Sequence, residues 1–242
     1  MNNPKVSYNQ AYTNFVLEMI HNDHTLNIFS DASMRRHEKG VLDSCYGAVA
    51  VCKDNIIDEW FRIQSSCTVP AAEIRGVRCS LTLAHKWKYH FKNINIFSDS
   101  QLAIFGLRDY IYNWQYNPAD NKLYNGLKGN KKPVKNQEVY IECLQMLDSL
   151  RMNGNIVTLY HQKGHVDNGM QSVKDALLVF KKSNGIMGKI DYNTIRYISL
   201  YNNYVDSKSR SIINRTNIFD NVYYDPVSFY ATSNLPTTIK VQ

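Results

Sequence analysis

The sequence predicts an α/β fold in which a mixed five-stranded sheet is flanked by helices. Two observations predict it. Apolar runs with the length and turn boundaries of strands occur five times, and stretches with apolar residues every three or four positions lie between them. The predicted order is three strands, a helix, a strand, two helices, a strand and a helix. The expected strands cover residues 26–30, 45–52, 56–63, 94–98 and 155–162.

The second and third strands are expected to form an antiparallel meander. "CYGAVAVC" (45–52) and "IIDEWFRI" (56–63) are separated by a turn-like Lys53-Asp54-Asn55. A long helix is predicted over Ala71–Phe91, because apolar residues from Ile74 onward recur at three- and four-residue intervals and define one face.

The second half of the chain alternates in the same way around the fourth and fifth strands. We predict helices over 101–108 and 137–151, a loop over 115–136 between them, and a final helix over 203–213. Residues 164–189 have a helical middle near 172–181, and residues 11–20 are a candidate for a short helix. These elements fit one domain, and 242 residues suffice for its core.

Charge and cysteine content limit the class of protein. The net charge of +7 and the pI near 9.0 indicate a polyanionic partner such as nucleic acid, although basicity without function is the alternative. Five cysteines, an odd number without a CxxC pair, predict free thiols in a reducing compartment and hence a cytoplasmic location. No stretch approaches 18 apolar residues, so no membrane span is expected.

Nearly the same phrase occurs twice, as "LNIFSDAS" (26–33) and "INIFSDS" (94–100). If the two strands are parallel neighbours, Asp31 and Asp99 lie side by side at the carboxyl ends, where open α/β sheets hold ligands. Two carboxylates this close repel each other unless a cation compensates them, and their oxygens suit Mg²⁺ or Mn²⁺. The alternative is that both are ordinary aspartates that cap helices.

Two further acids strengthen the metal hypothesis. Glu73 is expected in the first turn of the 71–91 helix, and Asp206 is expected to open the last helix. Either could instead be a partner of a helix dipole. Together with Asp31 and Asp99 they form a set of oxygen ligands that could hold two divalent metals for phosphodiester chemistry.

These residues carry a resemblance to type 1 ribonuclease H, in the ribonuclease H-like superfamily. It covers roughly residues 25–215, and "SDSQ", "KKPVKN" and "KGH" make it specific when taken together. The matching segments fall in the family's order: the first strand with "DAS", the Glu73 helix, "FSDSQLAIFGLRDYIYNW" (97–114), "GNKKPVKNQEVY" (129–140), "QKGHVDN" (162–168) and "NNYVDSKSR" (202–210). The resemblance implies a ribonuclease H-like fold for residues 25–215, an N-terminal extension (1–24) and a C-terminal tail (216–242).

The resemblance also implies roles for individual residues. Asp31, Glu73, Asp99 and Asp206 match the four acidic ligands of two Mg²⁺ or Mn²⁺ ions. His165 matches a mobile histidine that aids proton transfer or product release, although it could simply be a solvated loop residue. The implied nucleic-acid contacts are Thr68, Gln101, Trp114, Lys122, Lys128, Lys131, Lys132 and Lys135. The lysines would form a protrusion that grips the DNA strand, and the alternative is a solvated loop.

The sequence departs from the family pattern in three places. "MRRHEKGVLDSC" (34–45) replaces a Gly-rich loop, and "TVPAAE" (68–73) lacks an Asn-Asn pair whose amides help to read ribose 2′-hydroxyls. About 40 residues separate His165 from Asp206, so an insertion lies near 169–200. Its basic residues make nucleic acid the first expected partner; a protein surface or a lid are alternatives.

The resemblance therefore predicts a hydrolase: a metal-dependent endonuclease that cleaves the RNA strand of RNA–DNA hybrids to 5′-phosphate and 3′-hydroxyl ends. One alternative is a nuclease of the same fold that acts on double-stranded RNA or structured DNA, which the altered "TVPAAE" favours. The other is a non-catalytic nucleic-acid-binding module. The sequence leaves the oligomeric state and the biological pathway open.

Overall fold

The computed structural model describes Ile20 and residues 22–36, 42–117, 119–120, 122–125 and 132–215. The helix considered for residues 11–20, apart from Ile20, and the tail from residue 216 lie outside the described residues. None of the described helices is long and apolar enough to cross a membrane. The five cysteines are free thiols.

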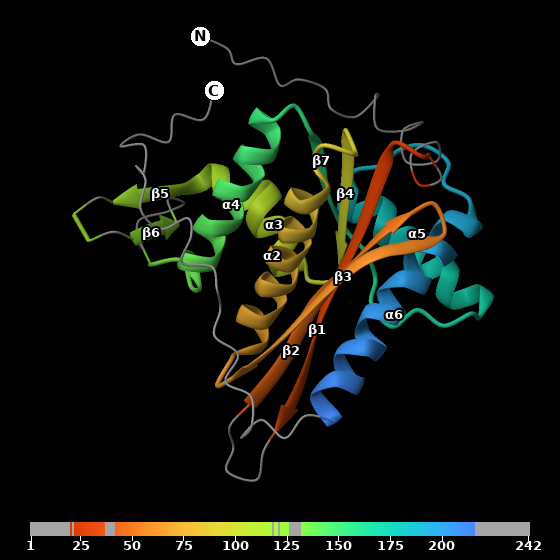
Figure 1. Ribbon diagram of the computed structural model, residues 1–242, viewed down its shortest axis with the longest axis horizontal. Coiled ribbons are helices and arrows are strands. Elements are labelled where there is room, and N and C mark those ends of the chain that lie inside the picture. The colour runs from red at the N-terminus through yellow and green to blue at the C-terminus, as the bar shows by residue number, and fades with distance from the viewer. Residues whose placement is uncertain are drawn as a thin grey trace.

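A five-stranded mixed sheet forms the centre of the fold, in the order β3-β2-β1-β4-β7 (Figure 1). The β1–β2 and β2–β3 pairs are antiparallel, which confirms the predicted meander, and β4 and β7 continue the sheet in parallel with β1. The strands are β1 (Thr25–Arg36), β2 (Leu42–Cys52), β3 (Asn55–Ser65), β4 (Asn93–Ser98) and β7 (Ile156–His161).

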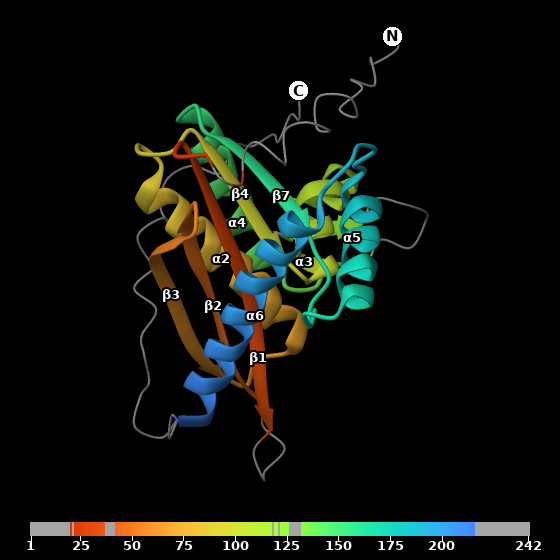
Figure 2. The ribbon, with the colours of Figure 1, turned by 90° about the vertical axis from the view of Figure 1, so that its right-hand side faces the viewer.

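Helices cover both faces of this sheet. α2 and α4 lie against one face, and α5 and α6 lie against the other, where they face the viewer in Figure 2. A short α3 follows β4 and continues as a π-helical turn (Gly106–Tyr110) and a 3₁₀ turn (Ile111–Asn113). The α-helices are α2 (Val69–Trp87), α3 (Gln101–Phe105), α4 (Gln137–Met152), α5 (Met170–Asn184) and α6 (Tyr192–Arg215).

Strand alternation divides the interior into two cores. In β1, Leu26 and Ile28 pack with α2 and α4, whereas Phe29 packs with α5 and α6. Phe29 stacks on Phe97 of β4 with ring centroids 4.8 Å apart, and Phe97 stacks on Tyr160 of β7 at 5.2 Å. The stack places β1, β4 and β7 in register under α6, on the same face as Asp31.

The predicted loop over 115–136 is wrong in part, because it contains a small second sheet. β5 (Trp114–Asn117) and β6 (Lys122–Asn125) pair antiparallel and lie beyond α4 in Figure 1. The Trp114 ring packs edge-on against Tyr140 of α4 at 4.8 Å, and Val134 N donates to Leu123 O at 2.8 Å. Two four-residue strands give too short an alternation for the sequence pattern to reveal.

Candidate metal and nucleic-acid site

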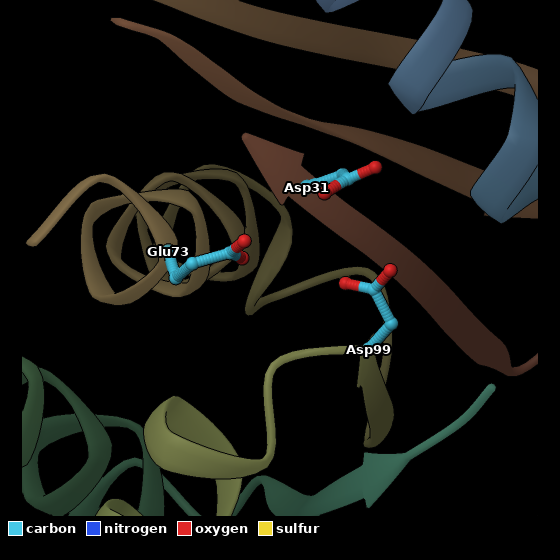
Figure 3. A group of neighbouring side chains, drawn as sticks. All are labelled: Asp31, Glu73 and Asp99. Carbon is cyan, nitrogen blue, oxygen red and sulfur yellow. The ribbon is translucent and has the colours of Figure 1, made fainter. Parts of the chain in front are cut away.

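Three carboxylates from three elements meet at one end of the sheet. Asp31 comes from β1, Glu73 from α2 and Asp99 from the residue after β4, and their side chains point toward one another in Figure 3. One oxygen of each lies within 4.8 Å of the others. The sequence prediction that Asp31 and Asp99 lie side by side agrees with this arrangement.

The parallel register of β1 and β4 brings the two aspartates together. Ser30 pairs with Ser98, so the next residue of each segment is Asp31 or Asp99. The expectation that both aspartates end strands is correct for Asp99 only, since β1 continues through Asp31 to Arg36 and pairs with β2 along that length. Asp31 is therefore held in a continuous ladder, and Asp99 begins a connection.

A close approach of α2 to β1 brings Glu73 to the site. Gly76 faces the Asp31 backbone, where an added Cβ would lie 3.2 Å from the Asp31 carbonyl oxygen. Glu73 lies one turn before Gly76, so the same approach carries its carboxylate toward Asp31. The first turn of α2 contains no acidic residue, which corrects the expected first-turn position of Glu73.

The three carboxylates disfavour one another's ionisation. Burial raises the pKa of Asp31, and the charges of Asp99 and Glu73 raise it further. Burial and then the charge of Asp99 raise the pKa of Glu73 to about 8. Burial also raises the pKa of Asp99, with Asp206 adding to the effect and His165 opposing it. At neutral pH the cluster therefore needs either protons or a cation.

A divalent metal fits this cluster. Glu73 Oε2 is buried and has no hydrogen-bond partner in the described part of the chain, so one ligand oxygen is left without a donor. Carboxylate oxygens from three directions are hard ligands of the kind that Mg²⁺ and Mn²⁺ take. The residues that could hold the metal are thus Asp31, Glu73 and Asp99.

Asp206 lies beside the cluster but is already compensated. Its Oδ2 is 2.7 Å from Nη2 of Arg210 and 3.4 Å from Nδ1 of His165, and Ser33 Oγ donates to its Oδ1 at 3.4 Å. Among the described residues, the group within 4.8 Å does not include it. The prediction that Asp206 opens the last helix is wrong, because α6 begins at Tyr192.

A cavity of about 370 Å³ joins the two parts of the site. The four predicted acids line it together with His165 and Arg210, so the structure gathers the predicted metal and proton-transfer residues at one opening. The full lining is Asp31, Ala32, Ser33, Met34, Glu73, Asp99, His165, Asp206, Arg210, Ile213 and Asn214.

The loop after β7 presents His165 to this cavity. His165 has a left-handed backbone (φ 52°), and 68% of its side chain is exposed. Gly164 before it lies against Asp99, where an added Cβ would come within 2.1 Å of Asp99 Oδ2. A side chain in place of the glycine of "KGH" would therefore have to displace the Asp99 carboxylate from the cluster.

The predicted nucleic-acid contacts comprise three non-basic residues, Thr68, Gln101 and Trp114, and a group of lysines. Thr68 caps α2 by accepting a hydrogen bond from Ala71 N at 3.4 Å, and Gln101 is exposed at the start of α3. Trp114 is partly buried against Tyr140. Thr68 thus caps the helix, and both Thr68 and Gln101 are exposed.

The predicted lysine protrusion is only partly described. Lys122 on β6, together with Lys132 and Lys135, is exposed around the small second sheet, whereas Lys128 and Lys131 lie outside the described residues. The insertion near 169–200 forms α5 and the first turns of α6, and Lys174 and Lys182 are exposed on α5. Both basic surfaces remain candidates for a phosphate contact.

Several residues at the site were missed from the sequence. Arg210 follows Asp206 at the i,i+4 spacing of a helical ion pair, so that spacing was an available signal. His161 of β7 contacts the Asp99 carbonyl oxygen through Nε2 at 3.1 Å, and Asn202 of α6 hydrogen-bonds Asp99 through its side chain. No sequence spacing indicates these two contacts, which join residues 62 and 103 positions apart.

Comparisons with known proteins point to one family. A family model described as RNase H matches residues 23–177, which is more than half of the chain. A ribonuclease H of Treponema denticola is 33% identical over 37% of this chain and 48% of that protein, and one of Ruthia magnifica is 37% identical over 35% and 49%. The matches thus span about half the length of these relatives. RNase H1 of Halobacterium salinarum, a solved structure, is 16% identical over 57% of this chain and 86% of that chain, with a TM-score of 0.38.

Proposed function

Since the chain belongs to the ribonuclease H family, we propose that it is a metal-dependent endonuclease that hydrolyses the RNA strand of RNA–DNA hybrids. The observation that carries the proposal is the cluster of Asp31, Glu73 and Asp99, three converging carboxylates within 4.8 Å. The products would have 5′-phosphate and 3′-hydroxyl ends. The five free thiols fit a reducing, cytoplasmic setting, which belongs to the same proposal.

Asp31, Glu73 and Asp99 would hold Mg²⁺ or Mn²⁺, and Asp206 across the cavity would serve a second ion. When bound, the metal supplies positive charge that stabilises the developing charge on the phosphate and activates a water for in-line attack. The carboxylates orient this centre because each is fixed by a different element of the fold. Their mutual repulsion favours cation binding.

His165 would handle the proton at the reacting oxygens. Its side chain is largely exposed, and its Nδ1 faces Asp206 Oδ2 at 3.4 Å. Asp206 is placed to orient the imidazole ring, and Arg210 Nη2 holds the Asp206 carboxylate at 2.7 Å. This arrangement allows His165 to donate a proton to the leaving oxygen and then to release the product.

The substrate is a polyanion, and exposed lysines would position it. Lys122, Lys132 and Lys135 lie around the small second sheet, and Gln101 lies at the start of α3 beside Asp99. Phosphate contacts from the lysines supply affinity that is independent of sequence. We assign the DNA strand of the hybrid to the lysines and the RNA strand to the carboxylates.

A second candidate function is cleavage of double-stranded RNA or structured DNA. Val69 and Pro70 open α2, close to the acids, where the resemblance implies an Asn-Asn pair. Val69 is 47% exposed and presents an apolar side chain, and proline has no amide hydrogen to donate. Recognition of the ribose 2′-hydroxyl would then require other groups.

Cleavage of matched substrates tests the proposal. An end-labelled RNA–DNA hybrid, the same sequence as double-stranded RNA and as double-stranded DNA, and each single strand are incubated with the protein and Mg²⁺. The proposal expects internal cleavage of the RNA in the hybrid, blocked by EDTA, with 3′-hydroxyl ends that a polymerase can extend. Preferential cleavage of either duplex would favour the second candidate. Cleavage of no substrate under any metal would contradict both.

A further inference from the structure

A histidine holds the backbone of Asp99 at the point where the sheet ends. Asp99 lies between β4 and α3, and Ser100 after it caps α3 by accepting a hydrogen bond from Ala103 N at 3.3 Å. The carbonyl oxygen of Asp99 faces Nε2 of His161 at 3.1 Å. Because a carbonyl only accepts hydrogen bonds, the ring proton lies on Nε2. His161 thereby fixes the peptide that orients the Asp99 side chain.

The insertion holds His161 in turn. Asn184, the last residue of α5, accepts from His161 N at 2.9 Å and donates to His161 O at 2.7 Å. β7 is an edge strand of the sheet, so this side chain satisfies backbone groups that a further strand would otherwise satisfy. His161 is itself buried, which leaves its ring little freedom.

Arg108 fixes Asn184 from the other side. Its Nη1 donates to Asn184 Oδ1 at 2.8 Å, and its Nη2 donates to Ser183 O at 2.8 Å. Arg108 lies in the π-helical turn that follows α3, a type of distortion often found at functional sites. The end of α5 is therefore tied both to β7 and to the segment that starts at Asp99.

Residues of α6 and of the segment after β7 surround the Asp99 carboxylate. Asn202 of α6 hydrogen-bonds it, and Gln162 Nε2 donates to Asn202 Oδ1 at 2.5 Å. Gly164 lies directly against the carboxylate. In the described part of the chain, His161 thus supports the backbone carbonyl of Asp99, and other residues support its side chain.

We propose that His161 is a positioning residue for the Asp99 metal ligand, and that the 169–200 insertion supports it through Asn184. The inference rests on the proposed function only in taking Asp99 as a metal ligand. It gives α5 a role in the metal centre that does not require contact with nucleic acid. Groups that orient metal ligands commonly change metal affinity 10- to 100-fold when they are removed.

Two amide substitutions of His161 test the inference. In His161→Gln the side-chain nitrogen reaches about as far as Nε2 and can still donate to the Asp99 carbonyl, whereas in His161→Asn it is too short. Mn²⁺ binding to the protein without nucleic acid is measured by titration of free Mn²⁺ with electron paramagnetic resonance. We expect His161→Asn to raise the Mn²⁺ dissociation constant about tenfold, and His161→Gln to restore most of the affinity.

His85 provides a matched control. Its Nε2 lies 3.0 Å from the Met146 carbonyl oxygen, so it makes the same kind of contact between α2 and α4, away from the acids. His85→Asn should leave Mn²⁺ affinity within about twofold of the parent, even where it lowers the melting temperature. Asn184→Ala should weaken Mn²⁺ binding in the same direction as His161→Asn, by a smaller factor.

Parental Mn²⁺ affinity in both His161→Asn and Asn184→Ala would overturn the inference, as would equal losses in His161→Asn and His161→Gln. If His161→Asn does not fold, Asn184→Ala is compared with His85→Asn. The inference requires that Asn184→Ala binds Mn²⁺ more weakly than the parent and that His85→Asn does not. Failure of the proposed function is recognised separately. In that case the parent would bind Mn²⁺ and these variants would bind it more weakly, but the parent would not cleave a hybrid.

Discussion

Asp31 and Asp206 line the same cavity, yet their surroundings differ in one respect. Asp206 has Arg210 at 2.7 Å and His165 at 3.4 Å. Asp31 has two further carboxylates instead, and burial together with their charges raises its pKa. Asp206 is paired with charged side chains of the protein. Asp31 accepts a hydrogen bond from Ala32 N at 2.7 Å but faces two further carboxylates, so a proton or an added cation would have to offset the remaining repulsion.

Under the proposed function, this difference separates the three-carboxylate metal cluster from Asp206, which would serve a second ion and orient His165. The cluster of Asp31, Glu73 and Asp99 is built at a cost to folding, which is typical of groups that are kept for a ligand. Asp206 with His165 and Arg210 resembles an ordinary ion-pair network that can also orient a catalytic histidine. Substitutions at these two places should therefore have unequal effects on catalysis.

The largest effect is expected from removing one charge of the cluster. Asp31→Asn and Asp99→Asn should each abolish measurable cleavage of the hybrid, because each removes a metal ligand. Binding of the hybrid should persist, since it depends mainly on lysine–phosphate contacts. Single-turnover cleavage and fluorescence anisotropy on the same preparations measure the two quantities.

Asp58→Asn is the matched control for this pair. Asp58 is partly buried on β3, where burial opposes ionisation, but hydrogen bonds from Lys86 and Trp87 outweigh it and lower the pKa. The control should cleave at the parental rate. Near-parental turnover in Asp31→Asn or Asp99→Asn would remove that residue from the catalytic centre.

An intermediate effect is expected at Asp206. Asp206→Asn should lower the cleavage rate about 10- to 100-fold, the range found when a group that orients a catalytic residue is removed. The loss should be smaller than for Asp31→Asn, because the three carboxylates of the cluster stay in place. The measurement is the single-turnover cleavage rate at saturating Mg²⁺. A complete loss of cleavage would instead place Asp206 among the indispensable ligands.

The smallest effect is expected from the lysines around the second sheet. Replacing Lys122, Lys132 and Lys135 with Ala should weaken hybrid binding and reduce the slope of log K against log salt by roughly 0.7–0.9 for each phosphate that the variant no longer neutralises. The comparison variant carries both Lys174→Ala and Lys182→Ala on α5, and its hybrid binding is titrated at the same salt concentrations. If only the α5 pair changes the slope, the insertion is the surface that holds the substrate.

The sequence predicted the centre of the site better than its edges. The repeated "IFSD" phrase located Asp31 and Asp99 because strand period and parallel pairing are local rules. The start of α6 was misplaced by eleven residues, from Asn203 to Tyr192, because the polar residues along this helix obscure its apolar face. His161 and Asn184 act through contacts that depend on how α5 docks on β7, and no periodicity encodes that docking.

The central claim is that the three carboxylates form a metal site, and the free energy of unfolding tests it most directly. The pKa of Glu73 is raised from 4.5 to about 8, so the folded protein binds more protons than the unfolded chain between these values. Without metal, the free energy of unfolding should therefore fall as pH rises from about 4.5 to about 8. Saturating Mg²⁺ should reverse most of this fall by binding the folded state alone.

Urea unfolding of the parent, Asp31→Asn and Asp58→Asn at pH 7, in EDTA and in Mg²⁺, is the decisive measurement. In EDTA, Asp31→Asn should be more stable than the parent by on the order of 1–3 kcal/mol, because the parent must either take up a proton at this buried carboxyl or leave it charged beside two others, and asparagine has neither cost. Asp58→Asn should be less stable, and Mg²⁺ should stabilise the parent much more than Asp31→Asn. A parent that Mg²⁺ does not stabilise, together with an Asp31→Asn variant no more stable than the parent in EDTA, would contradict the account.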